Sequence, residues 1–134
     1  MTLFTIGEKE HELKITYKSV KHLEGLFEGG SLGFIEAAMS GSLTTFSHVI
    51  HAALFHTGEN YSLAQVDAAI EAAFDSGLVD LTYIYNTINE VVLDSFFFAK
   101  VVRNLKAKNP EAFKQMNEIL TTNESSKTDG GSSD

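Results

Sequence analysis

Residues 2–16 read TLFTIGEKEHELKIT. Residues 2–6 have the composition of a short strand, and residues 10–16 alternate polar and apolar side chains with the period of two that is typical of a half-buried strand. Gly7 lies between them, at a turn where positive φ is needed. From residue 17 onward the apolar spacing becomes helical. The residues that carry this new spacing are Tyr17, Val20, Leu23 and Phe27.

No further strand is indicated, so we predict a mainly α fold. An N-terminal β-hairpin within residues 1–16 precedes a bundle of about five to six helices. A chain of 134 residues is of ordinary size for one domain, and we place that domain at residues 1–120. Residues 121–134 contain no apolar side chain. They are predicted to be a disordered polar tail, because they bury too little surface to offset their ordering entropy.

The most clearly marked helix follows Ser62. Ser62 and Gln65 have the spacing of a capping box, and Gly77 is expected to end the helix. The predicted buried stripe of this helix consists of Leu63, Val66, Ile70, Ala73 and Phe74.

Four more helices are predicted from caps and spacing. One covers residues 31–40 with Ser31 as its N-cap, and another covers residues 43–56. The longest covers residues 80–107 and is capped by its first residue, an aspartate, while Pro110 starts the last helix at the tolerated first position. The inward stripe of the longest helix is predicted to be Leu81, Ile84, Ile88, Val91, Val92, Ser95, Ala99 and Val102.

One part of the longest helix is apolar on nearly every side. The residues responsible, which we call the aromatic cluster, are Phe96, Phe97, Phe98, Val101 and Val102. A helix that is apolar all round is either central in a bundle or covered by something else, and an exposed apolar patch usually marks a partner site. Both interpretations stay open for this cluster.

Three histidines and a glutamate form the only grouping that resembles a metal site: His48, His51, His56 and Glu59. His56 is five residues beyond His51, which places it about 140° further round a helix. Histidines that are hydrogen-bonded or face solvent are therefore the favoured interpretation. We predict no catalytic, cofactor-binding or metal-binding residues, and no enzymatic activity.

The net charge of −8 argues against a nucleic-acid partner, which would require a basic face. The most apolar stretch, near residues 91–102, is interrupted by Asp94 and Ser95, and a membrane span needs ~20 mostly apolar residues. No membrane partner is predicted. The absence of cysteine and of a signal-peptide pattern is compatible with an intracellular location.

Three segments carry a resemblance to a known family. They are the hairpin of residues 3–14, the run of residues 61–66 that leads into a helix ending at Gly77, and the aromatic run of residues 95–98 in a long apolar helix. In this order they resemble the tail assembly chaperones of long-tailed phages that infect Gram-positive bacteria, or of prophages derived from such phages. The resemblance spans roughly residues 1–120.

The resemblance implies a role without catalysis. Proteins of that family bind the tape measure protein, a long and largely apolar helical chain, keep it soluble in the host cytoplasm, and are absent from the mature virion. The family commonly makes a second, longer product by ribosomal frameshifting, and that extension is associated with recruitment of the tail tube protein. For the client-binding surface we first consider the aromatic cluster, and then the apolar residues of the predicted helix 43–56.

Other functions stay open at this point. They are a structural head–tail or tail connector of a phage, a small helical regulatory adaptor, and a metal-dependent enzyme that uses the histidines. Residues 31–56 have the outline of a helix-turn-helix, but residues 43–56 lack the Arg, Lys, Gln and Asn that contact bases. Self-association as a homo-oligomer is an alternative way to cover the aromatic cluster.

Overall fold

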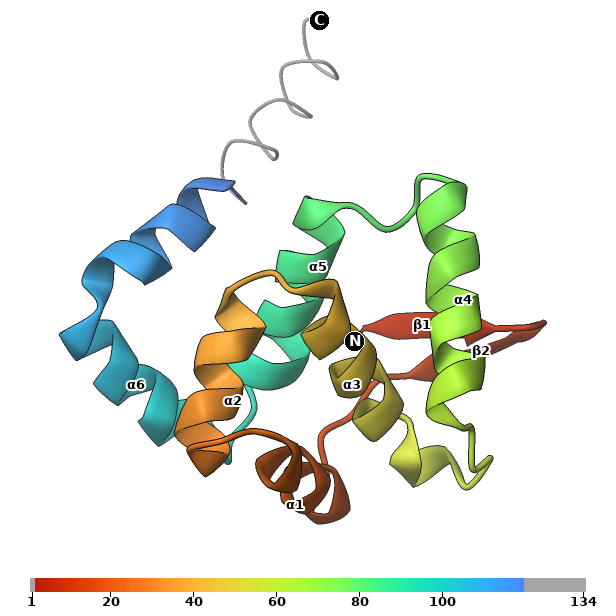
Figure 1. Cartoon of the computed structure of the whole chain (residues 1–134), viewed down its shortest axis with the longest axis horizontal. Helices are drawn as coiled ribbons and strands as arrows, with labels where there is room; N and C mark the ends of the chain where they lie inside the picture. Colours follow the sequence, from red (N-terminus) through yellow and green to blue (C-terminus); the bar gives the residue numbers. More distant parts are fainter. Residues whose placement is uncertain (1, 120–134) are drawn as a thin grey trace, which may run out of the picture.

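The structure, a computed structural model, describes residues 2–119 (Figure 1). It begins with strands β1 (Leu3–Ile6) and β2 (Lys9–Glu12), which pair antiparallel. Gly7 takes a φ of +63° in the turn between them. The predicted hairpin is confirmed, although its second strand ends before residue 16. The predicted tail at 121–134 lies outside the described residues.

The second strand is short because the backbone amides that follow it change partners. The N–H of Leu13 still donates to the carbonyl of Thr2 (2.8 Å), but the N–H of Lys14 donates to the carbonyl of Ala53 (3.0 Å). The Leu13 side chain is buried. The chain therefore joins the helical body at this point.

Apart from its connecting loops, the remainder of residues 2–119 is helical, which confirms the mainly α class. The first helices are α1 (Tyr17–Leu26), α2 (Gly30–Met39), α3 (Leu43–Ala53) and the 3₁₀ turn η1 (Phe55–Thr57). They are followed by α4 (Leu63–Asp75), α5 (Leu81–Thr87), the π-helical segment η2 (Ile88–Leu93), α6 (Ala99–Lys108) and a last helix over residues 110–119.

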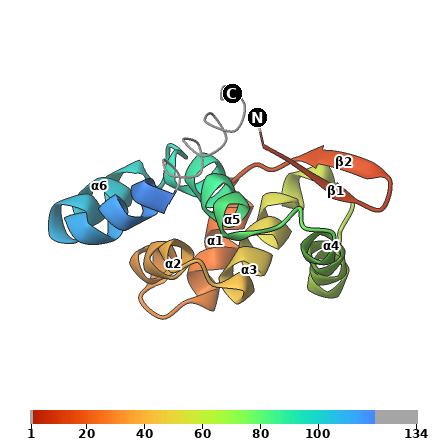
Figure 2. The same cartoon turned by 90° about the horizontal axis from the view of Figure 1, so that it is seen from above.

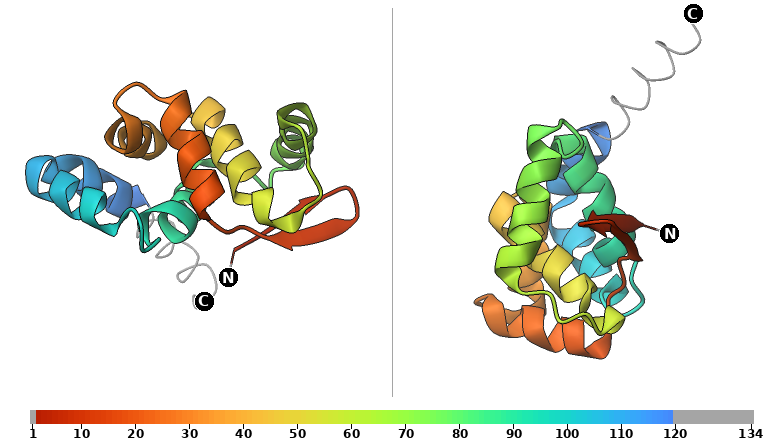
Figure 3. Two further views of the ribbon diagram at one scale, coloured as in Figure 1. Left: turned by 90° about the horizontal axis from the view of Figure 1, so that it is seen from below. Right: turned by 90° about the vertical axis from the view of Figure 1, so that its right-hand side faces the viewer.

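The helices are arranged along one long axis. Figures 1 and 2 show α6 and the last helix at one end of the molecule, and α4 with the hairpin at the other end. The left view of Figure 3 shows the same order from below. Between these ends, α1 packs against α2 and α3, and α3 packs against α4.

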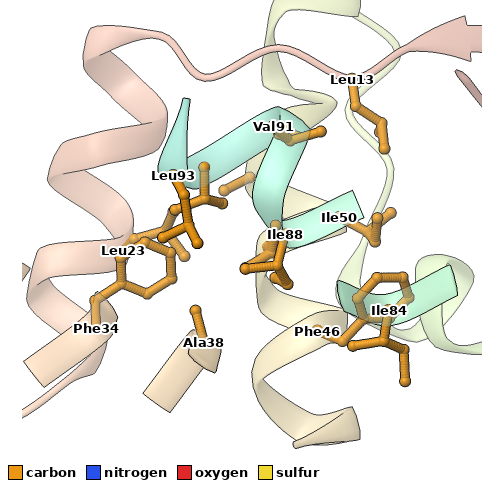
Figure 4. Close-up of a cluster of buried hydrophobic side chains, with 14 of the residues drawn as sticks. Leu13, Leu23, Phe34, Ala38, Phe46, Ile50, Ile84, Ile88, Val91 and Leu93 are labelled. Carbon is orange, nitrogen blue, oxygen red and sulfur yellow. The ribbon is translucent and has the colours of Figure 1, made fainter. Parts of the chain in front are cut away.

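The hydrophobic core is centred on the segment η2. Figure 4 shows Ile88 of this segment between Leu23 and Phe34 on one side and Phe46 and Ile50 on the other. All five side chains are almost completely buried. They come from α1, α2, α3 and η2, so the core joins segments that are far apart in the sequence.

Both ends of α4 follow the sequence signals. The Ser62 hydroxyl accepts the N–H of Gln65 (3.1 Å), and the Gln65 side chain accepts the N–H of Ser62 (2.8 Å). Gly77 takes a φ of +85° just after the helix, so the predicted cap and stop are both confirmed. The predicted stripe is wrong at Phe74, which is 52% exposed, because α4 runs antiparallel to α3 and its last turn lies beyond the first residues of α3 (Figure 1).

The start of α2 differs from the prediction. Its N-cap is Gly29, with a φ of +91°, whereas the hydroxyl of Ser31 donates to the carboxylate of Glu24 on α1. A Cβ atom at Gly33 would lie 1.9 Å from the carbonyl oxygen of Glu28. The close approach of the α1–α2 loop to this helix therefore requires glycine there, and the tight loop starts the helix before Ser31.

The predicted single helix over residues 80–107 is interrupted. Asp80 caps α5 as predicted, but η2 and a turn at residues 94–98 separate α5 from α6. One straight helix presents only one face to a core, whereas this turn lets Phe98 and Val102 point inward as well. Of the predicted inward stripe, Leu81 is exposed, Ser95 and Ala99 are half-buried, and the buried members are Ile84, Ile88, Val91, Val92 and Val102.

A small cluster of histidine and phenylalanine rings joins α1 to α3. The ring of His22 lies 5.7 Å from that of His51 and 5.1 Å from that of Phe55, in edge-to-face arrangements. Partial burial lowers the pKa of His22 below its usual 6.5, and the nearby His51, His48 and Lys18 lower the pKa further. The fold therefore favours the neutral form of His22.

Replacing Phe98 with alanine should lower the free energy of unfolding by about 3–5 kcal/mol, because a fully buried ring is removed and a cavity remains. The matched control is Phe96→Ala, whose ring is 98% exposed, and it should change the free energy by no more than about 0.5 kcal/mol. Urea denaturation followed by circular dichroism measures both values. Equal losses in the two variants would contradict the burial of Phe98.

The stability of the protein should fall as the pH drops below about 6.5. Because the pKa of His22 is lower in the folded chain than in the unfolded chain, the unfolded state binds the proton first, and stability is lost as the pH falls through the folded pKa. Urea midpoints measured between pH 7.5 and pH 5 should decline less steeply for His22→Gln than for the wild type. His56→Gln, an exposed histidine outside the ring cluster, is the control and should keep the wild-type slope.

Candidate partner-binding surface

The structure divides the aromatic cluster between surface and core. Phe96 is 98% exposed and Phe97 is 55% exposed, both in the turn between η2 and α6. Phe98 and Val102 are buried, and Val101 is half-buried against the core. The surface available to a partner is therefore formed by Phe96, Phe97 and Val101, and whether it binds one stays a prediction.

One of the two exposed phenylalanines, Phe97, belongs to a series of ring contacts that leads into the core. The ring of Phe97 lies edge-on against Phe98, with centroids 5.2 Å apart, and Phe98 lies 5.4 Å from Phe34 of α2. Phe34 in turn lies 5.4 Å from the half-buried Phe27. Because Phe98 and Phe34 are completely buried, Phe97 is supported by the core.

A groove continues from Val101 along the interface of α2 and α6, two helices that lie side by side in Figures 1 and 2. Two adjacent hollows, of about 380 Å³ and 210 Å³, form it. Both are lined by Glu36, Leu105 and Asn109. We call this feature the α2–α6 groove; its other lining residues are Leu32, Met39, Ser40, Val101, Asn104, Lys108, Ala112 and Phe113.

Two side chains of opposite charge line the α2–α6 groove. Glu36 is the only charged residue of α2, and Lys108 closes α6 on the other side. Within residues 2–119 the only ion pair joins Lys9 to Glu59 (2.9 Å). Glu36 and Lys108 thus have no ion-pair partner in the described chain and are open to charges on a ligand.

The second set of predicted contact residues belongs to the core. Phe46, Val49 and Ile50 of α3 are completely buried, and only Leu43 at the start of that helix is substantially exposed. The inward face of α3 therefore forms part of the bundle and offers little apolar surface to a partner.

A second exposed apolar group lies around the α4–α5 connection, and the sequence did not single it out. It consists of Phe74, Leu78 and Leu81, which are between 48% and 70% exposed. One residue in the sequence could have indicated this surface: Leu78, which is apolar although it lies in the short connection between a helix stop at Gly77 and a helix cap at Asp80. The group runs from the last turn of α4, the helix at the end of the molecule away from α6, to the start of α5 in the centre (Figure 2).

The three histidines of the metal hypothesis do not converge: the ring of His48 lies edge-on to Phe27, with centroids 6.3 Å apart, and its buried Nδ1 has no hydrogen-bond partner among the described residues, whereas His51 and His56 bond to separate carbonyls. His51 donates its Nε2 hydrogen to the carbonyl of Tyr61 (3.0 Å), and His56 donates to the carbonyl of Glu12 (2.7 Å). Glu59 pairs with Lys9 on the hairpin. Across residues 2–119, no three histidine, aspartate or glutamate side chains are arranged to hold a metal ion.

Residues 29–33 have the G-x-S-x-G spacing of a nucleophile elbow, centred on Ser31. That motif requires a turn from a strand into a helix and a histidine base near the serine. Here the segment joins α1 to α2, and the Ser31 hydroxyl donates to Glu24. The structural context of a hydrolase is therefore missing around this serine.

Over residues 2–119, none of the helices has both the length and the hydropathy of a membrane span.

A family model described as phage tail assembly chaperone protein, TAC, matches residues 3–107. The match runs from β1 to the last turn of α6 and includes the hairpin, the Ser62 capping box and the aromatic turn. Searches of curated proteins and of solved structures gave no significant match. The chain belongs to the phage tail assembly chaperone family.

Proposed function

We propose that the protein assists phage tail assembly by binding the tape measure protein and keeping it soluble, without catalysing a reaction. The observation that carries this proposal is the exposure of Phe96 and Phe97, two consecutive rings in the turn before α6, whose residue Val101 lines the α2–α6 groove. Monomeric soluble proteins rarely leave such a continuous apolar surface uncovered. An apolar helical client is the kind of partner that would cover it.

Burial of the two exposed rings can supply enough binding free energy for a tight contact over a small area. Burying a phenylalanine side chain contributes about 1.5–3 kcal/mol, so Phe96 and Phe97 together supply several kcal/mol of binding. Large aromatic side chains often dominate an interface in this way. The net charge of −8 opposes aggregation of the complex, because acidic chains repel one another.

We place this activity in the host cytoplasm, before the virion is complete, and expect the protein to be absent from the mature particle. We assign the recruitment of tail tube protein to a longer product, in which a ribosomal frameshift would extend the present sequence. Both statements rest on family membership.

Co-expression with the tape measure protein encoded downstream tests the proposal. The long protein should be soluble with the wild-type chain and should co-purify with it in several copies. Phe97→Asp should abolish both effects while the circular dichroism spectrum stays helical, because a charge replaces a contact ring on the surface. If Phe97→Asp instead unfolds the chain, then that ring belongs to the core.

A matched control is Phe74→Asp. Phe74 is 52% exposed and Phe97 is 55% exposed, so the two substitutions remove rings of similar accessibility from different elements, one at the end of α4 and one in the turn before α6. Phe74→Asp should keep the tape measure protein soluble. A tape measure protein that stays insoluble with the wild-type chain, or detection of this chain in mature particles, would favour a connector instead.

A further inference from the structure

We propose that the α2–α6 groove binds one amphipathic helix, whose apolar stripe lies over Leu32, Val101 and Leu105 and whose basic flank faces Glu36. The identity of that helix as part of the tape measure protein rests on the proposed function, but the chemistry of the groove does not. The client would then bind in this groove, whose lining includes Val101, four residues after the exposed Phe97.

The dimensions of the groove fit a helix. Its walls, α2 and α6, contain ten residues each, which corresponds to a length of about 15 Å. An occupying helix would therefore contact it over nearly three turns. Helices that bind in grooves do so through side chains at i, i+3 or i+4, and i+7, and the two hollows provide room for such a row.

The apolar wall residues differ in how far they can contribute. Leu32 is 48% exposed, and Val101 and Met39 are half-buried, so each has surface left to lose. Leu105 is buried already and forms the base of both hollows. The apolar surface that becomes buried on binding therefore belongs chiefly to Leu32, Val101 and Met39. Of these, Leu32 is the residue to alter without disturbing the fold.

The charges set the direction of the bound helix. Glu36 on the α2 side and Lys108 on the α6 side have no ion-pair partner within residues 2–119. A ligand with a cation facing α2 and an anion facing α6 satisfies both, and the reverse placement repels both. Charges at a rim contribute more to specificity than to affinity, so the preference should be modest and should weaken with salt.

Two other occupants fit the groove less well. Residues 121–134 contain no apolar side chain and cannot supply the stripe. A second copy would bring its α4–α5 apolar group, which is flanked by Asp75 and Asp80, against Glu36. No lysine or arginine occurs between Lys21 and Lys100, so neither α4 nor α5 supplies a cation beside that group, and two chains of charge −8 repel each other.

The test uses the full chain and two fluorescein-labelled helical peptides of about 18 residues. Both carry the same leucine stripe; the first has lysine on one flank and glutamate on the other, and the second has glutamate on both flanks, so that it cannot place a cation against Glu36 in either direction. Fluorescence anisotropy gives the dissociation constants. The first peptide should bind up to about fivefold more tightly than the second at low salt, and Glu36→Lys should remove or reverse that difference.

Leu32→Asp should weaken binding of the first peptide by more than about tenfold, since it places a charge in the apolar wall. Leu78→Asp, an exposed leucine at the opposite end, is the control and should bind as the wild type does. Equal binding by these two variants, or equal binding of the two peptides by the wild type, would overturn the inference. So would a dimer in sedimentation that Leu32→Asp dissociates, because the occupant would then be a second copy.

The outcome is separable from that of the proposed function. If Leu32→Asp loses the peptide but still keeps the tape measure protein soluble, then the chaperone function stands and the groove is not the seat of that client. If the wild type binds the first peptide selectively but never keeps the tape measure protein soluble, then the groove chemistry stands and the client is another helical protein.

Discussion

The C-terminal part of this fold depends on the burial of Phe98 against Phe34, whose ring centroids are 5.4 Å apart. This contact fixes the turn at residues 94–98 and holds the start of α6 against α2. Once Phe98 points inward, the two residues before it have no room in the core, so Phe97 stacks on the edge of Phe98 and Phe96 extends into solvent. The packing that completes the core therefore also creates the exposed aromatic surface.

Features set by local interactions were predictable from the sequence. The hairpin, the capping box at Ser62 and the stop at Gly77 depend on residues that are close in the chain. The break between η2 and α6 was not predictable, because the apolar spacing of residues 80–107 is compatible with one helix. Competition among distant elements for the core interrupts that helix. The N-cap of α2 is Gly29 instead of Ser31 for a local reason, because the α1–α2 loop passes close to Gly33.

The candidate surface was predictable only in outline. The sequence identified the aromatic cluster, but it cannot show which of three consecutive phenylalanines is buried, because that depends on the packing of the core. The α2–α6 groove could not be inferred, because its two walls are about 70 residues apart in the chain and neither Leu32 nor Glu36 is unusual for a helix. The apolar group at Leu78 left a faint signal in its position between a helix stop and a helix cap.

The two ends of the molecule are attached to its centre very unequally. The hairpin is tied to the α3–α4 region by the Lys9–Glu59 ion pair, the His11–Tyr61 hydrogen bond and the bond from His56 to Glu12. By contrast, α6 packs chiefly against α2 and joins η2 through a short turn. One wall of the groove is therefore held by apolar packing, through Val102 and Leu105, whereas the hairpin is held partly by polar contacts. Salt screens charged contacts but does not weaken apolar packing, so the two ends of the molecule should respond differently to ionic strength.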